Sequence, residues 1–139
     1  MKKNGFTLVE LLGVIVILAI ILVFAVPKIL SVIDSSRQNI YKSDVNTIVE
    51  EIKYIYENTM SLNEPEYKLY DFDSLTQKQE EALTFKGDKP SSGIIRINET
   101  GGQFESIVVT NLISSDGKWC ANKSANSKDI TVSKASDCN

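Results

Sequence analysis

The sequence of 139 residues contains no histidine. Catalytic centres that use an imidazole base are therefore excluded, and so are metal sites ligated through histidine. The chain also shows no nucleophile paired with a base, no glycine-rich phosphate loop, no internal repeat and no low-complexity segment. These absences argue against an enzyme and against a resident metal or other cofactor.

The chain also lacks a large excess of either charge. It has 15 basic and 18 acidic residues, which gives a net charge of −3. A mildly acidic chain lacks the basic surface on which nucleic-acid binding depends, so no nucleic-acid partner is predicted. The hydrophobic residues make up 42% of the chain, and they crowd into the first 33 positions. The length accommodates one membrane segment and one small domain with a modest core.

A long apolar run covers Phe6 to Val26, in which Thr7 and Glu10 are the strongly polar members. As an α-helix this run is roughly 30 Å long, which matches the thickness of a bilayer core. The basic residues at positions 2 and 3 precede the run, and basic residues favour the cytoplasmic side. We therefore predict a single span with the N-terminus inside and the rest outside. A cleaved secretory signal fits poorly, because no A-x-A-like site follows the run.

Beyond Lys28 the apolar residues recur at steps of three and four, which is typical of an amphipathic α-helix. The predicted stripe contains Ile29, Ile33, Ile40, Tyr41, Val45, Ile48, Val49, Ile52, Ile55, Tyr56 and Met60. Pro27 lies at the junction and should kink or locally loosen the helix, because proline lacks a backbone donor. Asn63 and Pro65 end the pattern, so we predict one helix of about 55 residues.

The C-terminal half should cover this stripe. Ser74 and Gln77 resemble a capping box, which predicts a short helix over about residues 75–84. Strands are predicted at 94–98, 103–111, 118–121 and 129–133, with a hairpin turn at 99–102. The predicted fold class is therefore α+β, in which a long N-terminal helix packs against a small antiparallel sheet of three or four strands.

The two cysteines, Cys120 and Cys138, both fall on the predicted outer side of the membrane. An exported domain with an even number of cysteines favours a disulfide. Such a bridge would tie the C-terminus to the sheet and contribute about 3 kcal/mol. Two free thiols or a shared metal are the alternatives, although two ligands without histidine make a poor metal site.

The N-terminal stretch MKKNGFTLVELL resembles the class III signal of type IV pilins and their relatives. Members share a short basic leader, a glycine before the cleaved bond, an aromatic first mature residue and a glutamate at the fifth mature position. Here these are Lys2 with Lys3, then Gly5, Phe6 and Glu10. The apolar helix that follows, and a proline at position 27, also match the pattern.

The resemblance implies that a prepilin peptidase cuts between Gly5 and Phe6 and methylates the new amine of Phe6. The mature subunits would form a helical homopolymer through their apolar helices, assisted by an assembly platform and its ATPase. Glu10 would pair with the amine of Phe6 on a neighbour. An unpaired ionised acid in hydrocarbon costs several kcal/mol, so a partner at the right depth would favour assembly. Snorkelling of Glu10 to the headgroups remains the alternative.

The resemblance divides the chain into a leader (1–5), a membrane and filament-core helix (6–27), its amphipathic continuation (28–62), a connecting segment (63–93), and a sheet with a C-terminal cysteine loop (94–139). It implies a structural subunit, of the major type, in an extracellular pilus that serves adhesion, twitching motility or biofilm formation. A pseudopilin of a type II secretion or DNA-uptake system is the alternative. A monomeric single-pass surface protein, with an uncut N-terminus, is the third hypothesis.

Overall fold

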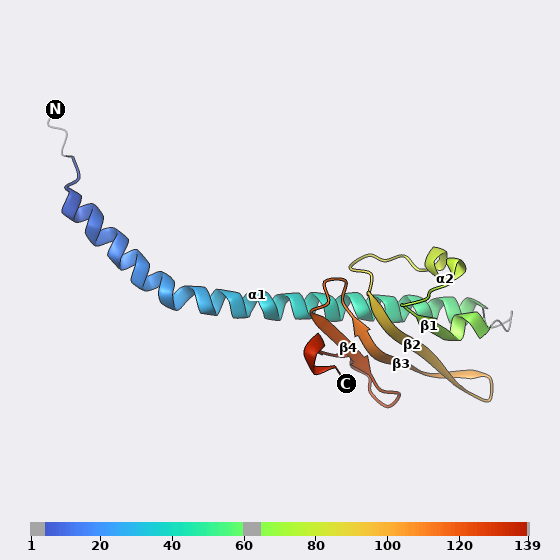
Figure 1. Cartoon of the computed structure of the whole chain (residues 1–139). Helices are drawn as coiled ribbons and strands as arrows, with labels where there is room; N and C mark the ends of the chain where they lie inside the picture. The colour runs from blue at the N-terminus through green and yellow to red at the C-terminus, as the bar shows by residue number, and fades with distance from the viewer. Residues whose placement is uncertain (1–4, 60–64, 139) are drawn as a thin grey trace. The chain divides into compact units, whose positions relative to one another are not determined.

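The computed structural model describes residues 5–59 and 65–138. The chain divides into a first unit, residues 1–37, and a second unit, residues 38–139. Helix α1 spans Leu8–Thr59 and supplies residues to both units (Figure 1). The predicted leader lysines at positions 2 and 3, and the predicted helix end at residues 60–63, lie outside the described residues.

In the first unit, α1 is apolar on every side from Leu11 to Val26. All residues from Gly5 to Arg37 are exposed except the half-buried Ala25. One 18-residue window of α1 has a mean hydropathy of 3.2, and none of that window is buried. By length and composition α1 can therefore cross a membrane. The helix continues through Pro27 without a break, so whether this proline kinks α1 stays a prediction.

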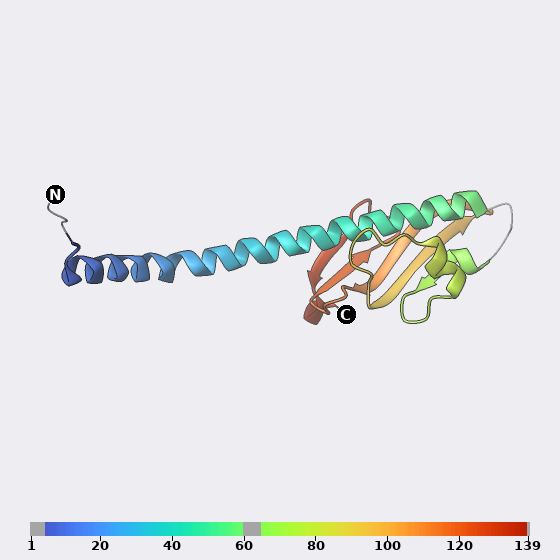
Figure 2. The ribbon, with the colours of Figure 1, turned by 90° about the horizontal axis from the view of Figure 1, so that it is seen from above.

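In the second unit, α1 packs one face against a sheet, as Figures 1 and 2 show. The buried helix residues are Tyr41, Val45, Ile48, Val49, Ile52 and Tyr56. The predicted stripe is therefore confirmed from Tyr41 to Tyr56, with Ile55 half-buried, and Met60 lies outside the described residues. It is wrong for Ile29, Ile33 and Ile40, which are exposed. Ile29 and Ile33 belong to the first unit, in which α1 is the one described element, and Ile40 lies off the buried face of the helix.

The sheet is an open antiparallel meander with strand order β1-β2-β3-β4-β5. Its strands are β1 (Leu69–Asp71), β2 (Ser92–Thr100), β3 (Gln103–Ile113), β4 (Trp119–Lys123) and β5 (Thr131–Lys134). The α+β class is confirmed, with one strand more than the three or four predicted. The additional strand, β1, lies in the segment predicted to be a connection. It follows the 3₁₀ helix η2 (Pro65–Lys68) and pairs with β2.

The hairpin between β2 and β3 turns on two glycines. Gly101 and Gly102 have φ angles of 63° and 80°, and Thr100 pairs with Gln103 across the turn. A two-residue hairpin turn needs positive φ at both positions, and glycine adopts it without steric cost. The predicted hairpin is confirmed, and β2 is longer than predicted by two residues at each end.

The short helix α2 spans Gln77–Ala82, which is narrower than predicted. Its capping box uses Thr76 and Gln79, whose side chains each bond the other's backbone nitrogen. The predicted box of Ser74 and Gln77 is wrong by two residues. Ser74 is engaged elsewhere, because its hydroxyl donates to the carboxylate of Asp71 at 3.0 Å and closes the turn after β1.

The core of the second unit lies between α1 and the sheet. Its most enclosed side chains include Val45 and Ile52 from the helix with Ile95 and Leu112 from the sheet, all 0% exposed. The hydroxyl of Tyr41 donates to the carbonyl of Leu112 at 2.8 Å, so this buried polar group is satisfied. The C-terminus is fixed at the edge of the sheet through the 3₁₀ helix η3 (Ala135–Asp137).

Candidate functional site

Thr7 and Glu10 form a closed arrangement at the start of α1. Glu10 Oε2 accepts one hydrogen bond from the backbone nitrogen of Thr7 and another from its hydroxyl, both at 2.8 Å. In return, the backbone nitrogen of Glu10 donates to the Thr7 hydroxyl oxygen at 3.3 Å. This is a capping box, in which two N–H groups that would lack partners at a helix start are satisfied.

Sequence reasoning missed this role of Glu10, because it treated the carboxylate only as a group in need of a partner from outside the chain. The signal was present, since Thr-x-x-Glu directly before an apolar run is a helix-start pattern. Both hydrogen bonds from Thr7 to the carboxylate use Oε2. Among the described residues, Oε1 accepts no hydrogen bond and can serve a second donor.

Gly5 and Phe6 precede the helix, have no regular secondary structure and are exposed. Phe6 is 85% exposed, and a Cβ added at Gly5 would meet no atom within 4 Å. The peptide bond between them is therefore open to another protein. Among the described residues, no close contact demands a glycine at position 5.

These three positions, Gly5, Phe6 and Glu10, lead directly into the fully exposed apolar part of α1. A family model, described as the prokaryotic N-terminal methylation motif, matches residues 1–26. The chain carries the class III signal of type IV pilins. No curated protein and no solved structure matches the chain.

The methylation motif covers the two residues at the predicted cleavage site and the predicted pairing residue, and it ends one residue before Pro27. It fits a membrane-anchored precursor that is processed by a prepilin peptidase and assembled into a filament. The second unit, residues 38–139, lies outside the motif.

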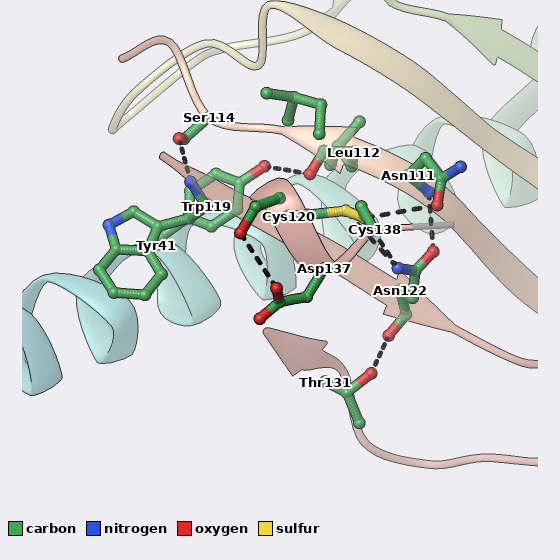
Figure 3. Close-up of a disulfide and its surroundings, with 12 residues drawn as sticks. Tyr41, Asn111, Leu112, Ser114, Trp119, Cys120, Asn122, Thr131, Asp137 and Cys138 are labelled. Carbon is green, nitrogen blue, oxygen red and sulfur yellow. Dashed lines mark hydrogen bonds between the residues drawn. A yellow bond between two sulfur atoms is a disulfide. The ribbon is translucent and has the colours of Figure 1, made fainter. Parts of the chain in front are cut away.

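The disulfide is the second predicted feature. Cys120 on β4 and Cys138 after η3 are joined, with their Cα atoms 6.2 Å apart (Figure 3). Cys120 is 0% exposed, whereas Cys138 is half-buried. The bond fastens the C-terminal residues to the sheet at a position adjacent to the buried Trp119.

Asn122 supports this region and was given no role from the sequence. Its side-chain oxygen accepts from the backbone nitrogen of Asn111 at 2.7 Å, and its side-chain nitrogen lies 3.3 Å from Cys138 Sγ (Figure 3). Asn111 has a φ of 48°, an uncommon conformation for a residue other than glycine. Asn122 therefore holds β3 and β4 together where their pairing is irregular. It also contacts the disulfide.

A polar cluster joins α1 to the hairpin at the opposite end of the sheet. Glu99 accepts from the hydroxyl of Tyr56 at 2.5 Å and from the ammonium of Lys68 at 2.9 Å. The hydrogen bond from Tyr56, followed by that from Lys68, lowers the pKa of Glu99. The hydrogen bond to Glu99, followed by burial, raises the pKa of Tyr56 to about 12. Sequence reasoning did not identify this cluster, because its members are far apart in the chain.

Proposed function

We propose that this chain is a structural, non-enzymatic subunit of an extracellular type IV pilus, of the major type that is incorporated repeatedly. The observation that carries the proposal is the methylation motif at residues 1–26, joined directly to an uncovered apolar helix. Adhesion, twitching motility or biofilm formation would be functions of the assembled filament. A prepilin peptidase would cut between Gly5 and Phe6 and methylate Phe6.

The exposed apolar surface of α1 supports polymerisation. From Phe6 to Ile33 the helix presents its large hydrophobic side chains outward, and most are at least half exposed. Such a surface is stable in lipid, where the subunit would reside with its N-terminus in the cytoplasm and its second unit outside. Once the subunit leaves the bilayer, the same surface needs cover from other apolar helices. Copies of this chain supply a helix of the same kind.

Glu10 supports a defined register between copies. After cleavage, Phe6 would carry a new amine only four residues from Glu10, so each subunit would hold an acid and an amine at similar depth. The pairing of Glu10 with the amine of a neighbouring Phe6 would add a charge-assisted contact at Oε1 beside the internal bonds from Thr7. Since charges separated in an apolar core are costly, an incorrect register would be disfavoured.

Mass spectrometry of the native protein tests the processing step. We expect a mature chain that starts at Phe6 and carries one additional methyl group on its amine. A chain that still begins at Met1 would contradict the proposal and favour a monomeric single-pass surface protein.

Immunoelectron microscopy with an antibody against the second unit tests where in a filament the subunit lies. Labelling along the shafts of surface filaments is the expected result. Labelling confined to filament ends would contradict the major-type assignment. A processed, methylated chain with no labelled surface filament would favour a pseudopilin of a secretion or DNA-uptake system instead.

A further inference from the structure

A groove of about 290 Å³ lies between α1, the start of β3 and the loop that follows β4. Its polar lining includes three lysines and two serines, and Phe104 contributes a half-buried aromatic ring. The groove lies within the second unit and shares no residue with the methylation motif or the disulfide. Its size is near the lower end of small-molecule sites, which suits one or two sugar rings.

The three lysines of this groove are Lys53, Lys123 and Lys128. Among the described residues, no carboxylate lies within 4.0 Å of any of their ammonium groups. Lys123 Nζ donates to the carbonyl of Ile107 at 2.9 Å, and Lys53 Nζ lies 5.3 Å from the centroid of Phe104. Both ammonium groups thus contact neutral partners and not carboxylates.

Carboxylates also line the groove and oppose this charge. Glu50 is exposed on α1, and Glu105 is exposed on β3. The Glu105 carboxylate accepts from the hydroxyl of Thr100 at 2.8 Å, so it is held toward the hairpin end of β3. The lysines still outnumber the acids in this groove, although the whole chain carries a net charge of −3. The groove is therefore locally basic on an acidic protein.

We propose that this groove binds a carboxylated sugar, such as a uronic acid unit of an acidic polysaccharide. The ammonium groups would hold the carboxylate through charge-assisted hydrogen bonds. The half-buried Phe104 ring gives an apolar surface for the C–H face of a sugar ring, above the buried side chains of Val49 and Ile107. The Ser106 hydroxyl accepts from the side-chain nitrogen of Asn98 at 3.3 Å and can donate its proton to a sugar hydroxyl. An anion without an apolar face would leave the aromatic side of the groove unused.

The test uses the full-length chain in detergent micelles and follows amide signals by heteronuclear NMR. The probe is digalacturonic acid, and its dimethyl ester is the matched neutral sugar. We expect digalacturonic acid to shift the amides of Lys53, Phe104 and Ser127, and to bind about tenfold more tightly than the ester. Equal binding of the ester would overturn the role of the lysines. No shift at these residues would overturn the site.

Inorganic phosphate is the third probe. Phosphate that binds as tightly as digalacturonic acid would overturn the sugar assignment, because the anion alone would then account for binding. Weaker binding of phosphate, by several fold, is the expected result. Binding is measured on unassembled protein, so its failure would leave the proposed pilus function untouched.

Variants localise the site. Lys128→Gln, at an exposed position that folding does not need, should weaken digalacturonic acid binding by about threefold to tenfold. Lys134→Gln makes the same charge change on exposed β5 outside the groove and should leave the affinity unchanged. Phe104→Leu should weaken binding of the sugar but not of phosphate. Equal affinities for Lys128→Gln and Lys134→Gln would overturn the proposal.

Discussion

Glu10 Oε2 lies 2.8 Å from both the backbone nitrogen and the hydroxyl oxygen of Thr7. The carboxylate at the start of the apolar helix is therefore satisfied in part by its own chain. This changes the energetic problem of an acid near a membrane, since internal bonds offset some of the cost before any neighbour arrives. In the proposed filament, a neighbouring amine would add to this arrangement through Oε1 without replacing it.

Replacing Thr7 with alanine should loosen the first turn of α1. The substitution removes the hydroxyl that bonds the Glu10 nitrogen, and loss of a threonine cap costs about 1 kcal/mol of helix stability. We expect faster amide hydrogen exchange over residues 8–11 in detergent micelles, with no change in the second unit. Thr7→Ser keeps the hydroxyl and serves as the control. Unchanged exchange in Thr7→Ala would show that the capping box does not hold the helix start.

A bulky side chain at position 5 should block processing. In Gly5→Leu the added Cβ meets no atom of this chain within 4 Å, so the fold tolerates the change, but the proposed peptidase would need a small residue before the cleaved bond. We expect a precursor that keeps its leader and yields no filaments. Gly13→Leu, where a Cβ also meets nothing within 4 Å, is the control for processing alone, because position 13 lies in the apolar helix proposed to pack in the filament. Normal mature protein and filaments from Gly5→Leu would refute the cleavage assignment.

The long helix and the main hairpin could be predicted from the sequence because their signals are local and repeated. An apolar run of membrane length, a stripe at helical steps and a Gly-Gly turn between β-rich segments each specify one structure. The short strand β1 could not be predicted in this way. It has three residues, too few for a recognisable alternation, and it exists because Tyr70 pairs opposite Ile95 on β2.

The same limit explains the parts of the candidate sites that sequence reasoning missed. The polar cluster brings together Tyr56, Lys68 and Glu99 from three separate elements. No spacing in the sequence predicts that these residues come into contact. The Ser74 capping box was mispredicted for a related reason. The Ser74 hydroxyl donates to the carboxylate of Asp71, and Thr76 is the N-cap residue of α2 instead.

Stability of the second unit should depend on pH through Tyr56 and Glu99. The pKa of Glu99 is lower in the folded chain, so its contribution is present above the unfolded value of about 4.3 and is lost as pH falls through the folded value. The pKa of Tyr56 is raised to about 12, so its contribution is present below pH 10 and is lost as pH rises toward 12.

Tyr56→Phe separates this hydrogen bond from ring packing, because the phenyl ring can keep its place beside Phe104. We expect a Tm lower by about 5 °C at pH 7, and a smaller loss of Tm at both pH extremes than in the natural chain. Circular dichroism of the protein in detergent gives these values. Identical pH profiles for the two proteins would contradict the role of the cluster.

Loss of the disulfide should destabilise the second unit, and the two cysteines should differ. Cys138→Ser removes the cross-link and should lower the free energy of unfolding by about 3 kcal/mol. Cys120→Ser removes the same cross-link but also buries a hydroxyl at a position that is 0% exposed, which costs about 1–3 kcal/mol more. Urea unfolding followed by fluorescence of Trp119, the single tryptophan, measures both. Equal losses would contradict the difference in burial.

The most direct test of the central claim is the yield of filaments from Glu10→Gln. Glutamine keeps the shape and an acceptor for Thr7 but removes the charge that would pair with a neighbouring Phe6 amine. Glu57→Gln makes the same change at an exposed position of α1 in the second unit and is the control. We predict that Glu10→Gln lowers sheared filament yield by about tenfold or more at equal levels of processed subunit, while Glu57→Gln does not. Equal yields from the two variants would contradict the pairing of Glu10 between subunits.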